Sequence, residues 1–272
     1  MFDLLDGRPS LELLPTRHIA QATQRALELP DAATNMLQYG RKNGEPEFLR
    51  QLANFLSEQY GATVVSRQLY GTSGASHSLE RILTILTRPQ GMTRFAIFQN
   101  PTYHLVFKVF ENVGFHQDQF VGISDRGDGL DVDELERFLQ SHLSPDTDSA
   151  LPVHYAAVLY CVPTHANPTS SVLSPERRSK LVDLARKYNV LVICDDVYDL
   201  LTYGSLPPPK RVVAYDVETK GKPVVISNGS FSKLLAPGIR VGWIEAQEAI
   251  IDRFTSSGSD ISGGQSANFS EC

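Results

Sequence analysis

Apolar residues recur at the spacing of one helical face in two stretches near the start of the chain, residues 49–56 and 79–86. In each stretch they stand three or four positions apart, so each stretch predicts an amphipathic helix. Gly61 follows the first helix as a typical C-terminal stop, and the second helix follows Ser76. The irregular segment before them contains one further predicted helix, near 17–28.

From about residue 95 onward, short and continuous apolar runs alternate with helical patterns. Five runs predict buried strands: residues 95–98, 155–162, 190–194, 224–226 and 241–244. Between the second and the third run, Ser174 followed by Pro175 is a typical helix start. Continuous apolar runs are typical of parallel strands that helices cover on both faces. The pattern therefore predicts the α/β fold class, as a three-layer α/β/α domain with a mostly parallel sheet.

Two segments lack this alternation. Residues 120–150 are polar and acidic, which predicts a surface connection around a short helix near 131–141. The tract from Ser256 to Gln265 is rich in glycine and serine, and we expect it to lead to Cys272 without a closing helix or strand.

Composition and charge narrow the class of protein. Hydrophobic residues make up 42% and charged residues 21% of the 272 residues, as in ordinary soluble domains. A net charge of −6 offers no basic footprint for nucleic acid. The three cysteines lack the spacing of a metal site or of a disulfide framework. The sequence shows neither a signal peptide nor a run of roughly 18 apolar residues, so we expect a cytoplasmic protein without nucleic-acid, membrane or metal partners.

Polar clusters stand where the predicted strands end or a helix begins. Gly74-Ala-Ser-His77 precedes the helix of residues 79–86, Asn167-Pro-Thr169 follows the strand of residues 155–162, and Asp195 ends the next strand. Ser230-Phe-Ser-Lys233 follows the strand of residues 224–226. Ligands of open α/β sheets bind beyond the carboxyl ends of the strands, so one site can collect all four clusters.

Together these clusters offer the groups that pyridoxal phosphate requires: an amine, an anion for its ring nitrogen and donors for its phosphate. Lys233 can supply the amine, and Asp195 can keep the ring nitrogen protonated. The candidate phosphate donors are the backbone of Gly74, Ala75 and Ser76 at a helix N-terminus, the hydroxyl of Ser230 and the guanidinium of Arg240.

Three motifs carry a resemblance to a known family. The stretch Ser230-x-Ser-Lys233-x-x-x-Pro-Gly-x-Arg240-x-Gly242 resembles the cofactor-lysine signature of class I/II aminotransferases, which are pyridoxal-phosphate enzymes of fold type I. Asn167-Pro-Thr and Asp195-x-x-Tyr198 resemble that family's NPT(G) and D-x-x-Y elements, in the family's order. The resemblance runs from about residue 35 to 250, and within the family it is nearest to the 2-aminoadipate and aromatic aminotransferase group.

The resemblance implies roles for further residues. Asn167 and Tyr198 are expected to hydrogen-bond the phenolic oxygen of the ring, and Tyr103 of Asn100-Pro-Thr-Tyr103 to stack on it. Tyr39 is expected to reach the active site of the partner subunit in a homodimer. The implied reaction moves an amino group between an amino acid and a 2-oxo acid through an aldimine of Lys233, which also acts as general base.

The resemblance also implies a domain division. Residues 1–40 correspond to an N-terminal arm and part of a small domain, and residues 41–272 to a large cofactor domain that is incomplete at its C-terminal end. Relatives continue into a small domain that carries the arginine for the substrate carboxylate, so we expect a truncated chain. Two departures stand out: Gly74-Ala-Ser-His77 replaces Gly-Ser-Gln-Gln, and Ser170 replaces the glycine after Asn-Pro-Thr.

Other functions compete with aminotransfer. A lyase or decarboxylase would use the same lysine and cofactor, and a truncated chain would fit a non-catalytic remnant. Ser230-Phe-Ser-Lys233 also matches the S-x-x-K motif of serine acyl-enzymes, but the Ser-Asp-Asn and Lys-Thr-Gly motifs of that class are missing. Asp195 would also suit a helix cap, although Tyr198 three residues later favours the cofactor role, and Tyr39 and Tyr103 would suit core or interface positions.

Overall fold

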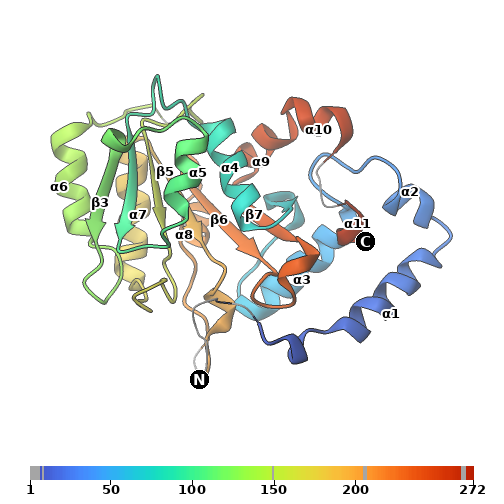
Figure 1. Ribbon diagram of the computed structural model, residues 1–272. Helices are drawn as coiled ribbons and strands as arrows, with labels where there is room; N and C mark the ends of the chain where they lie inside the picture. The colour runs from blue at the N-terminus through green and yellow to red at the C-terminus, as the bar shows by residue number, and fades with distance from the viewer. Residues whose placement is uncertain (1–6, 8, 149, 205–206, 265–267) are drawn as a thin grey trace.

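A seven-stranded, mostly parallel sheet forms the centre of the computed structural model, which describes residues 7, 9–148, 150–204, 207–264 and 268–272 (Figure 1). In spatial order the strands are β1 (Leu69–Thr72), β7 (Gly242–Ala246), β6 (Val225–Ser230), β5 (Val190–Asp195), β4 (Ala157–Cys161), β2 (Phe95–Asn100) and β3 (Phe120–Ser124). Strand β7 runs antiparallel to both of its neighbours, and the remaining neighbours pair in parallel. The carboxyl ends of six strands therefore meet at one edge.

Helices cover both faces of this sheet. On one face lie α6 (Val132–His142), α7 (Pro175–Tyr188) and α8 (Val212–Thr219), and on the other α4 (Ala75–Leu86), α5 (Val106–Asn112) and α9 (Glu248–Thr255). The remaining α-helices are α1 (Thr16–Leu27), α2 (Ala32–Met36), α3 (Pro46–Tyr60), α10 (Gly258–Gly263) and α11 (Asn268–Glu271). Short 3-10 helices are η1 (Leu11–Leu13), η2 (Ser66–Gln68), η3 (Gln117–Gln119), η4 (Asp199–Leu201) and η5 (Pro237–Ile239).

The predicted helix ends are confirmed by their caps. Gly61 ends α3 in the left-handed conformation, with φ of 60°. Ser174 caps α7 by accepting a hydrogen bond from the backbone N–H of Arg177. The α/β class and the five predicted strands are also confirmed.

The short helix expected near residues 131–141 is confirmed as α6. Two other predictions about irregular segments are wrong. Residues 120–150 contain strand β3, whose first residues Phe120 and Val121 are only half buried because β3 lies at the sheet edge. The glycine- and serine-rich tract forms α10. Tertiary contacts hold this helix, since the buried Asp260 accepts hydrogen bonds from Tyr70 Oη at 2.9 Å and from Arg81 Nη2 at 2.5 Å.

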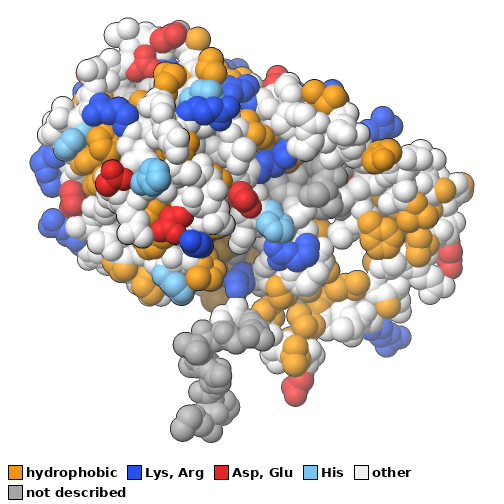
Figure 2. Space-filling view, turned by 45° about the horizontal axis from the view of Figure 1, so that its top comes forward, with side chains coloured by type: hydrophobic (Ala, Val, Ile, Leu, Met, Phe, Trp, Pro, Cys, Tyr) orange, Lys and Arg blue, Asp and Glu red, His pale blue; other side chains and the backbone are white. Residues whose placement is uncertain are grey.

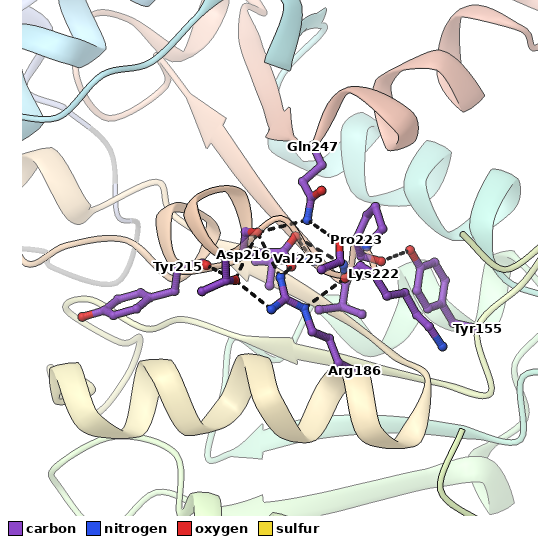
Figure 3. A network of polar contacts seen from close by, with 11 residues as sticks. Tyr155, Arg186, Tyr215, Asp216, Lys222, Pro223, Val225 and Gln247 are labelled. Carbon is purple, nitrogen blue, oxygen red and sulfur yellow. Dashed lines mark hydrogen bonds and ion pairs between the residues drawn. The ribbon is translucent and has the colours of Figure 1, made fainter. Parts of the chain in front are cut away.

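A buried polar network joins α7, α8 and the start of β6 at the sheet edge opposite the strand carboxyl ends (Figure 3). Asp216 Oδ1 accepts a hydrogen bond from Arg186 Nη2 at 2.7 Å. Its Oδ2 accepts from the backbone N–H groups of Val224 and Val225 at 3.3 and 3.4 Å. Arg186 also donates to the carbonyl of Lys222, so these groups satisfy one another's hydrogen-bonding capacity.

The N-terminal helices α1 and α2 lie beside the sheet domain (Figure 1), and the segments that flank them carry unusually exposed apolar side chains. Leu11, Leu13 and Leu37 are 84%, 82% and 67% exposed. Figure 2 shows hydrophobic side chains gathered over this part of the molecule, at the right of the view. Patches of this kind are typical of surfaces that another protein segment covers.

No helix within the described residues is both long and apolar enough to cross a membrane. Among those same residues there is also no grouping of three histidine, cysteine or acidic side chains suited to a metal ion.

Candidate active site

A cavity of about 260 Å³ lies at the carboxyl ends of the strands. Nine of the ten residues that the sequence analysis assigns to the cofactor line it: Ala75, Ser76, Tyr103, Asn167, Asp195, Tyr198, Ser230, Lys233 and Arg240. The tenth, Gly74, is the N-cap of α4 and borders Arg240. The structure thus brings together all four polar clusters, although their individual roles remain predictions.

Asp195, the last residue of β5, is the principal anion of the cavity. Its Oδ2 accepts a hydrogen bond from Tyr160 Oη, whereas its Oδ1 is buried and has no hydrogen-bond partner among the described residues. Burial raises the pKa of Asp195 to about 6, although the hydrogen bond from Tyr160 opposes this rise. A protonated ring nitrogen would supply the donor that Oδ1 lacks, so this residue fits the cofactor.

The N-terminus of α4 forms a cradle for an anion. Gly74 has φ of +94°, a backbone conformation that strains any other residue, and a Cβ atom on it would lie 2.8 Å from Arg240 Nη2. Arg240 Nη2 donates to the carbonyl of Ser73 at 3.1 Å, which holds the guanidinium beside the helix start. Asn228 of β6 donates to the carbonyl of Ala75 and fixes the same turn. Free helical N–H groups together with a guanidinium favour a phosphate.

The segment after β6 carries the amine. Ser230 Oγ accepts a hydrogen bond from the backbone N–H of Ser232 at 3.1 Å and donates to Ser232 Oγ at 2.9 Å, which closes a tight turn before Lys233. Lys233 Nζ donates to the carbonyl of Gly7 at 2.5 Å. The N-terminal segment therefore contacts the amine that the sequence analysis selects.

Two tyrosines lie close to Asp195. Partial burial raises the pKa of Tyr103, and the charges of Asp195 and Tyr198 raise it further. Tyr103 follows β2 and Tyr198 follows β5, so the two strands on either side of β4 deliver both rings to the cavity.

Comparison with known proteins decides the family. The family model for aminotransferases of class I and II matches residues 2–266. The chain belongs to this family. Its members depend on pyridoxal phosphate.

Two relatives illustrate the similarity of the sequence. The chain is 36% identical over 295 residues to the uncharacterized protein YER152C of Saccharomyces cerevisiae, which covers 95% of the chain and 66% of that protein. It is 30% identical over 251 residues to aromatic-amino-acid aminotransferase 1 of Thermococcus litoralis, which covers 92% of the chain and 55% of that protein.

Solved structures agree with this assignment. An archaeal alanine:glyoxylate aminotransferase superimposes with a TM-score of 0.78 at 27% identity, over 98% of the chain and 60% of that protein. The kynurenine aminotransferase of Pyrococcus horikoshii, solved with PMP, gives a TM-score of 0.77 at 28% identity over 98% and 60%. The chain thus spans about half to two thirds of the length of the proteins it matches.

Some residues at the cavity received no role in the sequence analysis. Val162 and Val197 line the cavity, as do Ser232 and Pro237 of the lysine signature, and Tyr160 hydrogen-bonds Asp195. A signal for Tyr160 existed in the sequence, because a tyrosine inside a continuous buried strand needs a partner for its hydroxyl.

Other candidates lie away from this cavity. Tyr39 is 80% exposed and lines a separate surface pocket with Gln38 and Gly40. His77 lines a third pocket with Arg81. His165 Nε2 lies 3.0 Å from Thr202 Oγ1, at hydrogen-bonding distance.

Proposed function

We propose that this chain binds pyridoxal phosphate at Lys233 and that the enzyme moves an amino group between an amino acid and a 2-oxo acid. The observation that carries the proposal is the unpaired, buried Oδ1 of Asp195 in the same cavity as Lys233 and the cradle at Gly74. Each of these three groups matches a different part of one cofactor. They come from segments that are far apart in the sequence, and a shared cofactor explains why they lie together.

Lys233 would have two successive duties. Its amine would hold the cofactor covalently until an amino-acid substrate displaces it. The freed amine would then take the proton from the substrate Cα and deliver it to the cofactor carbon two bonds away, as a general base and acid. Bound pyridoxal phosphate supplies the electron sink that makes this Cα proton acidic.

The surrounding residues would orient and polarise the bound group. Asp195 would keep a proton on the ring nitrogen, Asn167 and Tyr198 would donate to the phenolic oxygen, and Tyr103 would pack on the ring. The phosphate would be held by the start of α4, by Ser230 and by Arg240.

Substrates, assembly and domain organisation are part of the proposal. Relatives named as aromatic-amino-acid and kynurenine/alpha-aminoadipate aminotransferases support a large amino-acid substrate with a 2-oxo acid as acceptor. The exposed apolar side chains of the N-terminal segment and of Tyr39 support a homodimer. We further infer a cytoplasmic protein, with residues 1–40 as arm and part of a small domain and residues 41–272 as the large domain.

The covalent step gives the first prediction. Addition of pyridoxal phosphate to the folded chain should produce a visible absorption band with one cofactor per chain, and borohydride should fix the cofactor to Lys233, as read by peptide mapping. Lys233→Ala should abolish the band because no other lysine of the described part of the chain lines the cavity. The matched control Lys108→Ala, at an exposed lysine of α5, should retain it.

Each outcome separates a different claim. A folded wild-type chain without a band would overturn the cofactor proposal. A band without transfer of labelled amino nitrogen to 2-oxoglutarate would leave cofactor binding in place and remove turnover by this chain.

A further inference from the structure

We propose that Asp125, which follows β3, is a positioning residue that holds the Asn167 segment in its place at the cofactor cavity. This inference rests on the proposed function, because it concerns how Asn167 is presented to pyridoxal phosphate. Asp125 lies in the stretch that the sequence analysis treats as a surface connection, and it does not line the cavity itself.

Three side chains converge on one oxygen of Asp125. Its Oδ2 accepts hydrogen bonds from Thr169 Oγ1 at 2.7 Å, from Ser171 Oγ at 2.5 Å and from Gln99 Nε2 at 2.7 Å. Thr169 and Ser171 belong to the segment that carries Asn167, only two and four residues away. The carboxylate therefore binds that segment directly.

The other oxygen fixes the orientation of the carboxylate. Asp125 Oδ1 accepts from the backbone N–H groups of Gly127 and Gly129 at 2.8 and 3.2 Å, and the N–H of Asp125 donates to the carbonyl of Asn100 at 2.8 Å. Partial burial opposes ionisation, but the hydrogen bonds from Ser171, Thr169 and Gly127 lower the pKa of Asp125 below its usual value. Asp125 is thus a charged acceptor anchored to the end of β2.

Gln99 extends the hold to the start of the same segment. While its Nε2 donates to Asp125, its Oε1 accepts from the backbone N–H of Val162 at 3.0 Å. Gln99 is 1% exposed, so water does not replace these bonds. Val162 lines the cavity, and Asn167 follows five residues later.

The segment needs an external hold because its backbone is strained. His165 and Ser170 have φ of 54° and 59°, in the left-handed region that is unfavourable for non-glycine residues. These two residues flank Asn167. The Asp125 contacts offset that strain at the tip of the loop.

The base of the loop is held separately. Arg178, which is fully buried, donates to the carbonyls of Pro163 and Leu173, both at 2.7 Å. Loss of the Asp125 carboxylate should therefore loosen the tip around Asn167 while the sheet and the loop base stay folded.

The test compares Asp125→Ala, Asn167→Ala and the double variant in the full chain. If Asn167 donates to the phenolic oxygen, Asn167→Ala should weaken cofactor binding and shift the pH midpoint of the absorption band. Asp125→Ala should shift the midpoint in the same direction and weaken binding about tenfold, the size that groups supporting a ligand contribute elsewhere. The double variant should differ little from Asn167→Ala alone, because both changes remove one interaction.

Two controls isolate the positioning role. Asp128→Ala removes an exposed carboxylate of the same connection, paired with Arg177, and should leave binding and midpoint at wild-type values. Asp125→Asn keeps one side-chain acceptor oxygen, so it should bind the cofactor more tightly than Asp125→Ala does. Equal effects of all three aspartate changes, or additive effects in the double variant, would overturn the inference.

A readout without cofactor keeps this test separate from the proposed function. The N–H groups of Ala166 and Ser170 bond within the segment, and Asp125→Ala should speed their hydrogen exchange while the strands keep their protection. Unchanged exchange would overturn the inference even if the wild-type chain binds the cofactor. A wild-type chain that gives no absorption band with pyridoxal phosphate would instead overturn the proposed function. Hydrogen exchange would still test whether Asp125 stabilises the Asn167 segment.

Discussion

Asp195 combines one hydrogen-bonded oxygen with one buried oxygen that has no partner among the described residues. Such an arrangement is costly when the group is charged, which is why the pKa of Asp195 rises to about 6 from 3.8. This free-energy cost is consistent with a binding site for a cationic hydrogen-bond donor, because such a donor would offset the lost hydration of the Asp195 carboxylate.

This environment predicts a pH-dependent stability without cofactor. The folded pKa of Asp195 lies above its unfolded value, so its stabilising contribution is complete below about pH 4 and is lost as the pH rises through about 6. Asp195→Asn, which stays neutral, should gain stability relative to wild type across that window. Urea unfolding at a series of pH values measures this difference, and a difference that does not vary with pH would contradict the assignment.

Tyr160→Phe provides the matched comparison. It removes the hydrogen bond that stabilises the carboxylate, so it should raise the pKa of Asp195 further and move the window to higher pH.

Ser170 shows how a single residue links the sequence motif to backbone geometry. The family usually has glycine after Asn-Pro-Thr, and Ser170 adopts φ of 59° there. Glycine is favoured at such a position because it adopts the left-handed region without a steric cost. The motif therefore encodes a turn as well as a ligand, a distinction that the sequence alone did not make.

Among the elements, hydrophobic patterning predicted those that are buried on both faces. Strands β2, β4 and β5 are continuous apolar runs, and each was placed to within a few residues. Strands β1 and β3 were missed, since β1 has only four residues and β3 lies half exposed at the sheet edge. The polar partners of Asp125 were missed for a related reason, because their meeting depends on strand order rather than on local sequence.

The Asp216 network makes a prediction about the stability of elements. Asp216→Ala would leave Arg186 and the N–H groups of Val224 and Val225 without their acceptor, and should lower the free energy of unfolding by about 3 kcal/mol. Urea unfolding midpoints measure the loss. Asp133→Ala removes an exposed carboxylate paired with Lys180 and should leave the midpoint unchanged.

The position of this network separates stability from cofactor binding. It lies at the edge of the sheet opposite the cavity, so cofactor affinity of the folded Asp216→Ala protein should equal that of wild type. A large loss of affinity under conditions where the variant is fully folded would show that the two edges are coupled.

At the scale of the whole molecule, the cavity depends on chain segments that meet only after folding. Residues from Ala75 to Arg240 line it, and Lys233 reaches the carbonyl of Gly7 from the opposite end of the sequence. The order of motifs predicted which residues would meet. It did not predict the contact with the N-terminal segment, because no local pattern there specifies a partner.

Tyr39 tests whether the proposed site extends across a dimer. It is 80% exposed and lies outside the Lys233 cavity of its own chain, so any role at the cofactor must come from a second copy. Tyr39→Ala and Lys233→Ala should each be nearly inactive alone. Mixed in equal amounts and allowed to exchange subunits, they should recover about a quarter of wild-type amino transfer, since half of the dimers then contain one intact site.

The control places both substitutions on one chain and mixes it with wild type. A chain carrying both Tyr39→Ala and Lys233→Ala contributes no intact site to a mixed dimer, because its partner's lysine then faces Ala at position 39 and its own site lacks the amine. Mixing it with wild type should therefore lower activity in proportion to the mixed dimers formed. Recovery in neither mixture, with mixed dimers present by size and mass, would assign Tyr39 to the surface of its own subunit.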